Sequence, residues 1–171
     1  MAEHMPLPST YFADDVYCIA FWNNVVLIDL DGDMTVSRMQ KVGEAYRALL
    51  AKYPRIVAVC VMRPGTPVAS ADARAEGARF TKELGEAVAR IAMVIESDGI
   101  VAQMLRSVVR GISVLARSKA FSLETDVNEA LRTLAPLVIS SGPRDQVQLD
   151  LKDAWHAVRA NFRPRQAAAG E

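Results

Sequence analysis

The sequence predicts an α/β fold: a mixed, mostly parallel five-stranded sheet that opens with a hairpin, with helices packed on it. An apolar, Val-rich run at 56–63 is too short for a helix and is typical of a buried strand. Two further apolar runs, 16–22 and 25–31, are separated only by Asn23-Asn24. Beyond residue 35, strand-like runs alternate with helix-like periodic segments, which is the order of parallel strands joined by helices.

The bulk composition narrows the class of protein. A length of 171 residues favours one domain with a tail, and Lys plus Arg equals Asp plus Glu at 20 each. A neutral chain lacks the basic footprint of a nucleic-acid binder, so no nucleic-acid partner is expected. Cys18 and Cys60 lie inside apolar runs, which favours buried reduced thiols and a cytoplasmic location. The N-terminus lacks signal-peptide order and no apolar stretch approaches transmembrane length, so no membrane span is expected.

The first half of the domain is expected to begin after a flexible lead-in at 1–13. Two Asn residues tolerate the positive φ angles of a tight turn, which supports the hairpin across Asn23-Asn24. A helix follows from about Thr35, a preferred N-cap residue, to Lys52, and Pro54 stops it.

The second half of the domain, which we place at 14–140, continues the alternation. Asp126 and Glu129 form a capping-box pattern at the start of the last of its helices. The predicted elements after the 56–63 strand are, in order, a helix at 70–86, a strand at 89–96, a helix at 99–117, a strand at 120–123 and a helix from 126 to about 138.

A C-terminal segment at 146–163 has the pattern of an amphipathic helix, followed by a frayed tail at 164–171. Its apolar stripe needs cover, since a helix of this length is marginal without packing. We expect it to dock on the helix at 99–117, near Val109 and Ile112; the alternatives are a second copy in a homodimer or a partner protein. The predicted tail interface comprises Leu151, Trp155 and Phe162.

The chain resembles the STAS / SpoIIAA-like fold, the domain of anti-sigma factor antagonists, over about Val16 to Val138. Three stretches carry the resemblance: the helix entry Leu30-Asp31-Gly32-Asp33-Met34-Thr35, the strand–loop–helix at 56–79, and the last helix start at 124–131. The resemblance implies a non-enzymatic protein–protein interaction module in bacterial intracellular signalling or regulation. It implies protein partners, a kinase or signalling regulator among them.

The same resemblance implies where partners bind. Regulators of this family carry a phosphorylated serine at the start of the second helix, and the matching residue here is Ser70, with Thr66 as a weaker acceptor. The implied partner-binding loop and helix comprise Gly65, Ser70, Asp72 and Arg74. A structural interpretation of Ser70 competes with this one, since serine is a preferred helix N-cap.

No reaction or metal site is predicted. Neither histidine has a ligand at metal-binding spacing, and no nucleophile–base motif is present, so we expect no enzyme and no cofactor. Cys60, in the middle of a strand, is expected to be a core residue. Three carboxylates alternate near the end of one strand: Asp29, Asp31 and Asp33. They could bind Mg²⁺ or Ca²⁺, but the favoured interpretation is that they are solvated side chains at a strand end.

Two further expectations concern the core and an alternative function. The helix at 99–117 is apolar on more than one face, so a small-ligand or lipid-binding module of SpoIIAA/Sec14-related type is the second candidate. In that case this helix and the tail would enclose an acyl chain.

The residues expected to be fully buried are Val26, Ile28, Val57, Val59, Ile95 and Leu105.

Overall fold

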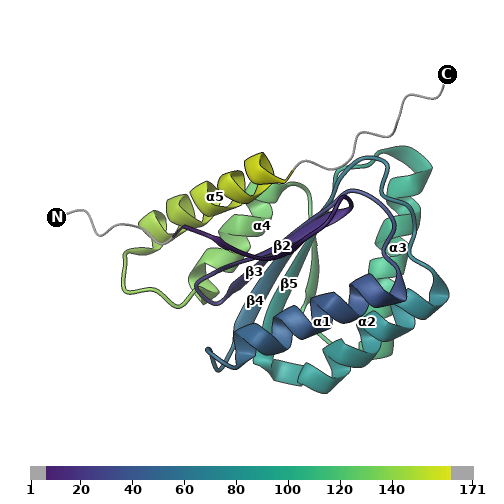
Figure 1. Ribbon diagram of the computed structural model, residues 1–171, viewed down its shortest axis with the longest axis horizontal. Coiled ribbons are helices and arrows are strands. Elements are labelled where there is room, and N and C mark those ends of the chain that lie inside the picture. Colours follow the sequence, from purple (N-terminus) through teal and green to yellow (C-terminus); the bar gives the residue numbers. More distant parts are fainter. Residues whose placement is uncertain (1–6, 163–171) are drawn as a thin grey trace.

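A single sheet with helices on both faces organises the computed structural model, which describes residues 7–162 (Figure 1). The strands are β1 (Ser9–Ala13), β2 (Tyr17–Trp22), β3 (Val25–Leu30), β4 (Ile56–Met62), β5 (Val88–Ile95) and β6 (Phe121–Glu124). The α-helices are α1 (Val36–Leu50), α2 (Ala71–Leu84), α3 (Gly99–Ala116), α4 (Val127–Leu134) and α5 (Arg144–Asn161), and short 3₁₀ turns follow α2 and α4.

The six strands lie in chain order across the sheet. The pairs β1–β2 and β2–β3 are antiparallel, and the pairs β3–β4, β4–β5 and β5–β6 are parallel. The α/β class and the mixed sheet that opens with a hairpin are therefore confirmed. At the hairpin turn Asn23 adopts a φ of 49°, as the asparagine pair predicts.

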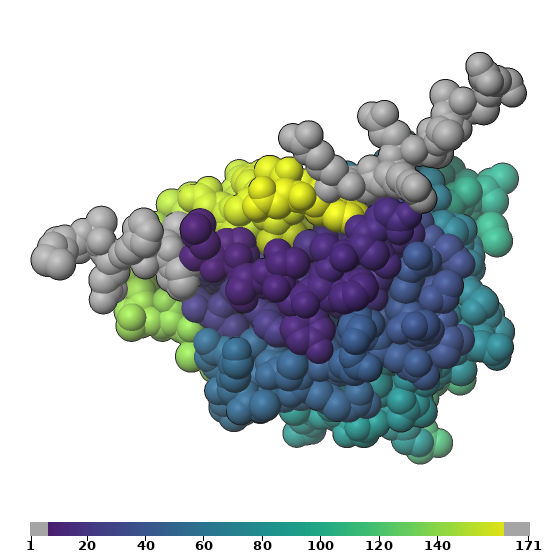
Figure 2. All heavy atoms as spheres, viewed as in Figure 1, coloured from purple at the N-terminus to yellow at the C-terminus, as the bar shows by residue number. Residues whose placement is uncertain are grey.

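The predicted strand count of five is wrong, because residues 9–13 form the edge strand β1 rather than a flexible lead-in. β1 pairs with β2, and the register shifts between Thr10 and Phe12. Phe12 packs against the apolar core, while Tyr11 lies over the ring of Phe21 at 4.9 Å between centroids. Figure 2 shows this strand at the surface between α5 and α1. The shortness of the strand and its mostly exposed side chains left no apolar alternation to detect.

Alternate side chains of the central strands face two separate cores. On β4, Ala58 and Cys60 point to the core under α1, α2 and α3, whereas Val57, Val59 and Val61 point to the core under α4 and α5. The two groups of helices lie on opposite sides of the sheet in Figure 1. This two-sided cover explains why the sequence of β4 is continuously apolar instead of alternating. All six side chains predicted to be buried are at most 8% exposed.

Asn24, next to the hairpin turn, joins distant parts of the chain. Its side-chain amide donates to the carbonyls of Arg55 and Leu137, at 3.2 and 3.1 Å, and its Oδ1 accepts from the backbone N–H of Ile139 at 2.8 Å. The side chain is buried with its hydrogen-bonding groups satisfied. Asn24 therefore fixes the segment after α4 against the sheet, immediately before the chain turns into α5.

The C-terminal helix α5 begins two residues earlier than predicted and packs on its own domain, but not on α3. Its apolar stripe lies against β2, β3 and α4, on the face of the sheet opposite α3. The predicted docking near Val109 and Ile112 is thus wrong: a second sheet face needed cover, and α4 is too short to cover it alone. The tail-interface residues are buried: Leu151, Trp155 and Phe162. The predicted frayed tail at 164–171 lies outside the described residues.

Within residues 7–162, α3 is the one helix long and apolar enough to cross a membrane when judged by length and composition alone. Its 18 residues have a mean hydropathy of 1.3, and 22% of them are buried. The sequence-based expectation that no apolar stretch approaches transmembrane length is therefore wrong for α3. In the fold, α3 packs along α2 and against β5 and β6.

Candidate functional site

The loop after β4 is held in place by Thr66. Its backbone N–H donates to the Arg63 carbonyl at 3.2 Å, and its Oγ1 donates to the Leu30 carbonyl, also at 3.2 Å. Gly65 takes a φ of +90°, a conformation that favours glycine. The side chain of Thr66 is 2% exposed. Thr66 therefore anchors the loop to β3. Its burial does not favour it as a phosphoacceptor, and that role stays a prediction.

Ser70 occupies the N-cap position of α2. Its Oγ accepts a hydrogen bond from the backbone N–H of Ala73 at 3.2 Å, and the side chain is exposed. The capping interpretation is confirmed, while phosphorylation stays a prediction with an accessible hydroxyl. Asp72 lies exposed in the first turn of α2, and Arg74, two residues further along, is half-buried. Gly65, at the exposed tip of the loop, completes the predicted partner-binding set.

Replacement of Ser70 by Ala is expected to lower the free energy of unfolding by about 0.5–2 kcal/mol, because the Ala73 N–H loses its side-chain acceptor. Ser70→Asp is expected to stay close to the wild type, since aspartate is an equally good N-cap. Urea unfolding of the three proteins measures this. A Ser70→Ala protein as stable as the wild type would show that the cap does not contribute.

A row of exposed apolar side chains runs along α3. Ile100, Met104, Val108, Gly111 and Leu115 are spaced by four, four, three and four residues, which places them on one stripe of the helix. Val108 is half-buried in this stripe, and Gly111 contributes backbone only. Ile100 is 76% exposed and Leu115 is 63% exposed. The opposite stripe is the buried one, with Leu105 and Val109 in the core. α3 thus has two apolar faces, one for its own domain and one without cover in the described chain.

A groove of about 340 Å³ separates this stripe from the start of α2. Its α2 side is formed by Ala71, Arg74 and Ala75, directly after the Ser70 cap. Small side chains on this side and Gly111 on the α3 side leave room for another backbone to approach closely. We call this groove and the exposed α3 stripe the α2–α3 face.

The arginines of this part of the fold are unpaired within residues 7–162. Arg74 lines the groove, whereas Arg106, Arg110 and the C-cap residue Arg117 are exposed on another side of α3, which itself contains no Asp or Glu. None of the three, nor Arg74, forms an ion pair with another residue in the range 7–162. The outer side of α1 and α2 differs, since Arg79 pairs there with Glu76 and Glu83. The surface of α1 and α2 is therefore neutralised internally, and that of α3 is not.

A second cluster of charges lies at the carboxyl ends of β3 to β5, on the α5 side. Arg63 donates two hydrogen bonds to the fully buried Asp29, at 2.9 and 2.6 Å, and its guanidinium lies over the ring of Phe162. Arg159 of α5 binds Glu96 in the same bidentate way, at 2.8 and 2.7 Å. This edge of a parallel sheet is where α/β folds place ligands. Here the end of α5 occupies it, so the two ion pairs fasten α5 to the sheet.

The carboxylates at 29, 31 and 33 do not converge on a metal site. Asp29 is buried in its pair with Arg63, while Asp33 is exposed. In the part of the chain that is described, no three His, Cys, Asp or Glu side chains lie close enough together to hold a metal ion. His156 lies exposed on α5, and His4 is outside the described residues.

Both thiols are buried and protonated at neutral pH. Burial, with a smaller contribution from the nearby Asp29 carboxylate, raises the pKa of Cys60 to about 12 and that of Cys18 to about 11. A thiol is nucleophilic only as the thiolate, so neither cysteine is activated. Cys60 is a core residue, as the sequence predicts.

These raised pKa values predict alkaline destabilisation. In the unfolded chain each thiol ionises near its ordinary pKa, so above about pH 9 the unfolded state binds fewer protons than the native state. Stability contributed by the neutral thiols is complete below that pH and is lost as the pH rises towards 11 to 12. Urea midpoints at pH 8 and pH 10.5 should differ less for Cys60→Ala than for the wild type. An equal difference would show that the Cys60 thiol contributes nothing to it.

The fold and this surface define an α/β protein with a mixed six-stranded sheet and an uncovered apolar helix face. No family model, curated protein or solved structure among those compared matches the chain. The resemblance to the STAS / SpoIIAA-like domain therefore stays a hypothesis carried by its motifs.

Sequence reasoning pointed to the loop after β4 and the start of α2, and it did not single out the exposed stripe of α3. The excess of apolar residues on the 99–117 helix was visible, yet periodicity alone cannot say which of its two apolar faces is buried. The absence of acidic residues from that helix, also visible in the sequence, was a further indication that its surface differs from that of the other helices.

Proposed function

We propose that this protein is a non-enzymatic protein–protein interaction module whose contact surface is the α2–α3 face. The observation that supports this is the exposed apolar stripe on α3. Large apolar side chains that lie contiguously on a surface mark interaction sites, whereas scattered ones need no explanation. Five of the large apolar side chains that are exposed among residues 7–162 belong to this one helix: Ile100, Val101, Met104, Val114 and Leu115.

The partner proposed is an amphipathic helix that carries acidic residues beside its apolar row. A groove between two helices accepts such a helix through apolar anchors spaced at three and four residues. Arg74, which lines the groove and forms no ion pair within residues 7–162, would face one of its carboxylates, which gives specificity and speeds association. A second copy of the chain is a poorer fit, since its α3 brings more arginine and no acidic residue.

The regulatory setting implied by the STAS-like resemblance is part of this proposal, as is a cytoplasmic location. Ser70 directly precedes Ala71, which lines the groove. A phosphate on Ser70 would bind the free N–H groups at the start of α2 and add negative charge at the edge of the groove. Phosphorylation of Ser70 by a kinase would thereby weaken the binding of an acidic partner.

The experiment uses charge substitution on the stripe. The double variant Met104→Glu/Leu115→Glu places two carboxylates where the partner's apolar row and acidic flank would lie. Leu149→Glu is the matched control, because Leu149 is 57% exposed but lies on α5, on the other side of the sheet. The partner is isolated on wild-type protein, and its contact segment is then synthesised as a peptide.

The peptide should bind the double variant at least about tenfold more weakly than the wild type, a loss of roughly 1.4 kcal/mol or more. It should bind the Leu149→Glu control as tightly as the wild type, and raising the salt concentration should weaken it. Equal binding to the double variant and the wild type would exclude the α2–α3 face as the contact surface.

A further inference from the structure

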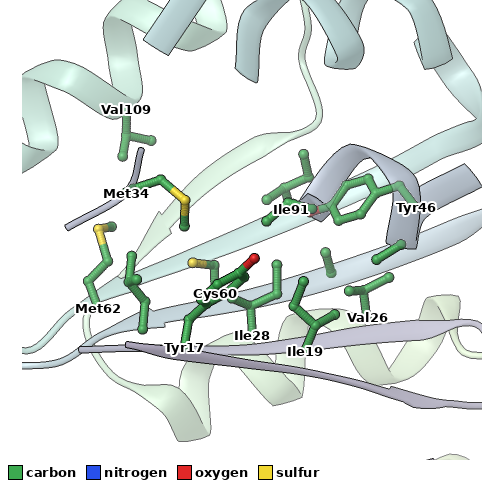
Figure 3. Packing of buried hydrophobic residues seen from close by; sticks show 14 of the residues in the cluster. Tyr17, Ile19, Val26, Ile28, Met34, Tyr46, Cys60, Met62, Ile91 and Val109 are labelled. Atoms are coloured by element: carbon green, nitrogen blue, oxygen red, sulfur yellow. The ribbon is translucent and has the colours of Figure 1, made fainter. Parts of the chain in front are cut away.

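A partly enclosed apolar pocket lies between the sheet and the three helices α1, α2 and α3. Its volume is about 110 Å³, and it is lined by side chains from β3 to β6, from the three helices and from the loop after β4. Figure 3 shows Val109, Met34 and Met62 at one end of this core, with Tyr46 and Ile91 at the other and Cys60 between them. The cavity is separate from the α2–α3 face, although Val108 and Ile112 of α3 line both.

The lining is almost wholly hydrocarbon and sulfur. No charged side chain borders the cavity. Of the three side chains in its lining that carry a hydroxyl group, Tyr46, Thr66 and Thr81, the two threonines donate to backbone carbonyls: Thr66 Oγ1 to Leu30 and Thr81 Oγ1 to Gly77, at 3.2 and 2.8 Å. The Cys60 thiol stays neutral. A water molecule needs two to four polar partners, so this lining favours an apolar occupant over water.

The size and softness of the space define the occupant further. Protein interiors seldom contain voids much larger than a water molecule, because the lining of a void loses its packing contacts. Engineered apolar cavities of roughly 150 Å³ remain dry and bind benzene, so this smaller space of about 110 Å³ would hold an aromatic ring once its lining moves slightly outward. Four methionines border this one, and methionine adapts its shape to a ligand.

We propose that this cavity is a binding site for a small, neutral, hydrocarbon-like molecule of about the size of a substituted benzene. This goes beyond the interaction module and does not depend on it. The site is not the acyl-chain enclosure between α3 and the tail that the sequence indicated, since α5 packs on the opposite face of the sheet.

The methionine methyl groups give a direct test. The chain has seven methionines, of which Met34, Met39, Met62 and Met93 line the cavity, whereas Met104 is 51% exposed on the outer face of α3. Protein labelled with [¹³C-methyl]methionine is titrated with toluene and with phenol, which has nearly the same shape. Toluene should shift the four cavity methyls saturably, with a dissociation constant on the order of 1 mM, and leave Met104 unchanged. Phenol should bind several-fold more weakly, because its hydroxyl would leave water for a lining that is almost wholly apolar.

Two variants of α3 make the test specific. Val109→Phe fills the cavity and should abolish the toluene response, while Val114→Phe makes the same change at a side chain that is 75% exposed and should preserve it. If Val109→Phe does not fold, the smaller Val109→Leu should still weaken the response. The proposal is overturned if toluene causes no saturable shift of the four methyls, if only Met104 responds, or if phenol binds more tightly than toluene.

Discussion

Truncation of the chain after Gly142 is expected to leave a protein that no longer unfolds cooperatively, because α5 covers β2 and β3 on one face of the sheet. The truncation exposes the apolar side chains of β2, β3 and α4 that pack against α5. It also leaves Glu96 without Arg159 and removes Phe162 from Arg63. Thermal melting by circular dichroism measures the effect. A truncated protein that melts as sharply as the wild type, at the same temperature, would show that α5 is dispensable for the domain.

A single substitution distinguishes the effect of lost α5 packing from the effect of shortening the chain. Trp155 is 1% exposed at the centre of the α5 stripe, and replacing it by Ala should cost about 3–5 kcal/mol of stability. His156, its exposed neighbour, is the matched control, and His156→Ala should change stability by at most about 0.5 kcal/mol. Similar unfolding midpoints for the two variants would contradict the docking of α5 on its own sheet.

Replacement of Val59 by Asp should prevent soluble folding altogether. Val59 is fully buried in β4, with strands on either side and the α4–α5 core above it. An unpaired carboxylate there costs several kcal/mol, against a total stability of only about 5–15 kcal/mol for a domain. The expected observation is insoluble or unfolded protein, measured by the soluble yield and by the absence of a thermal transition.

The control for this substitution is the same chemical change at a side chain outside the core. Val114 is 75% exposed on α3, and Val114→Asp should shift stability by at most about 0.5 kcal/mol. A soluble Val59→Asp protein that melts cooperatively would show that β4 is not the central strand. Loss of folding in both variants would show instead that the chain is intolerant of any added charge.

Local signals predicted most of the fold. Thr35, Ser70 and Asp126 each cap the helix that the sequence assigned to them, and Asn23 makes the hairpin turn. These features depend on a few neighbouring residues, so they can be predicted from the local sequence. β1 was not predicted because it is an edge strand that is ordered by pairing with β2, and its own sequence gives no local sign of that contact.

The candidate site was harder to predict, since it depends on how elements pack. The amphipathic stripe of α5 showed that the helix needed cover, but its receptor follows from the two-sided sheet and not from the stripe. Likewise Asp29 appears in the sequence as one of three alternating carboxylates, and only the fold brings Arg63 to it from the end of the next strand. The cavity under α3 arises from five or more elements together and has no local signature.

Site-specific photo-crosslinking in living cells tests the central claim, that the α2–α3 face binds a protein partner. A photoreactive phenylalanine derivative replaces Met104 or Leu115 on the exposed stripe, and Leu149 on α5 in the control protein. The proposal predicts one crosslinked polypeptide at both stripe positions and none at Leu149. Its attached segment should carry an apolar row at helical spacing beside acidic residues. A stripe that crosslinks no more than Leu149, or that crosslinks only to a second copy of this chain, would contradict the proposal.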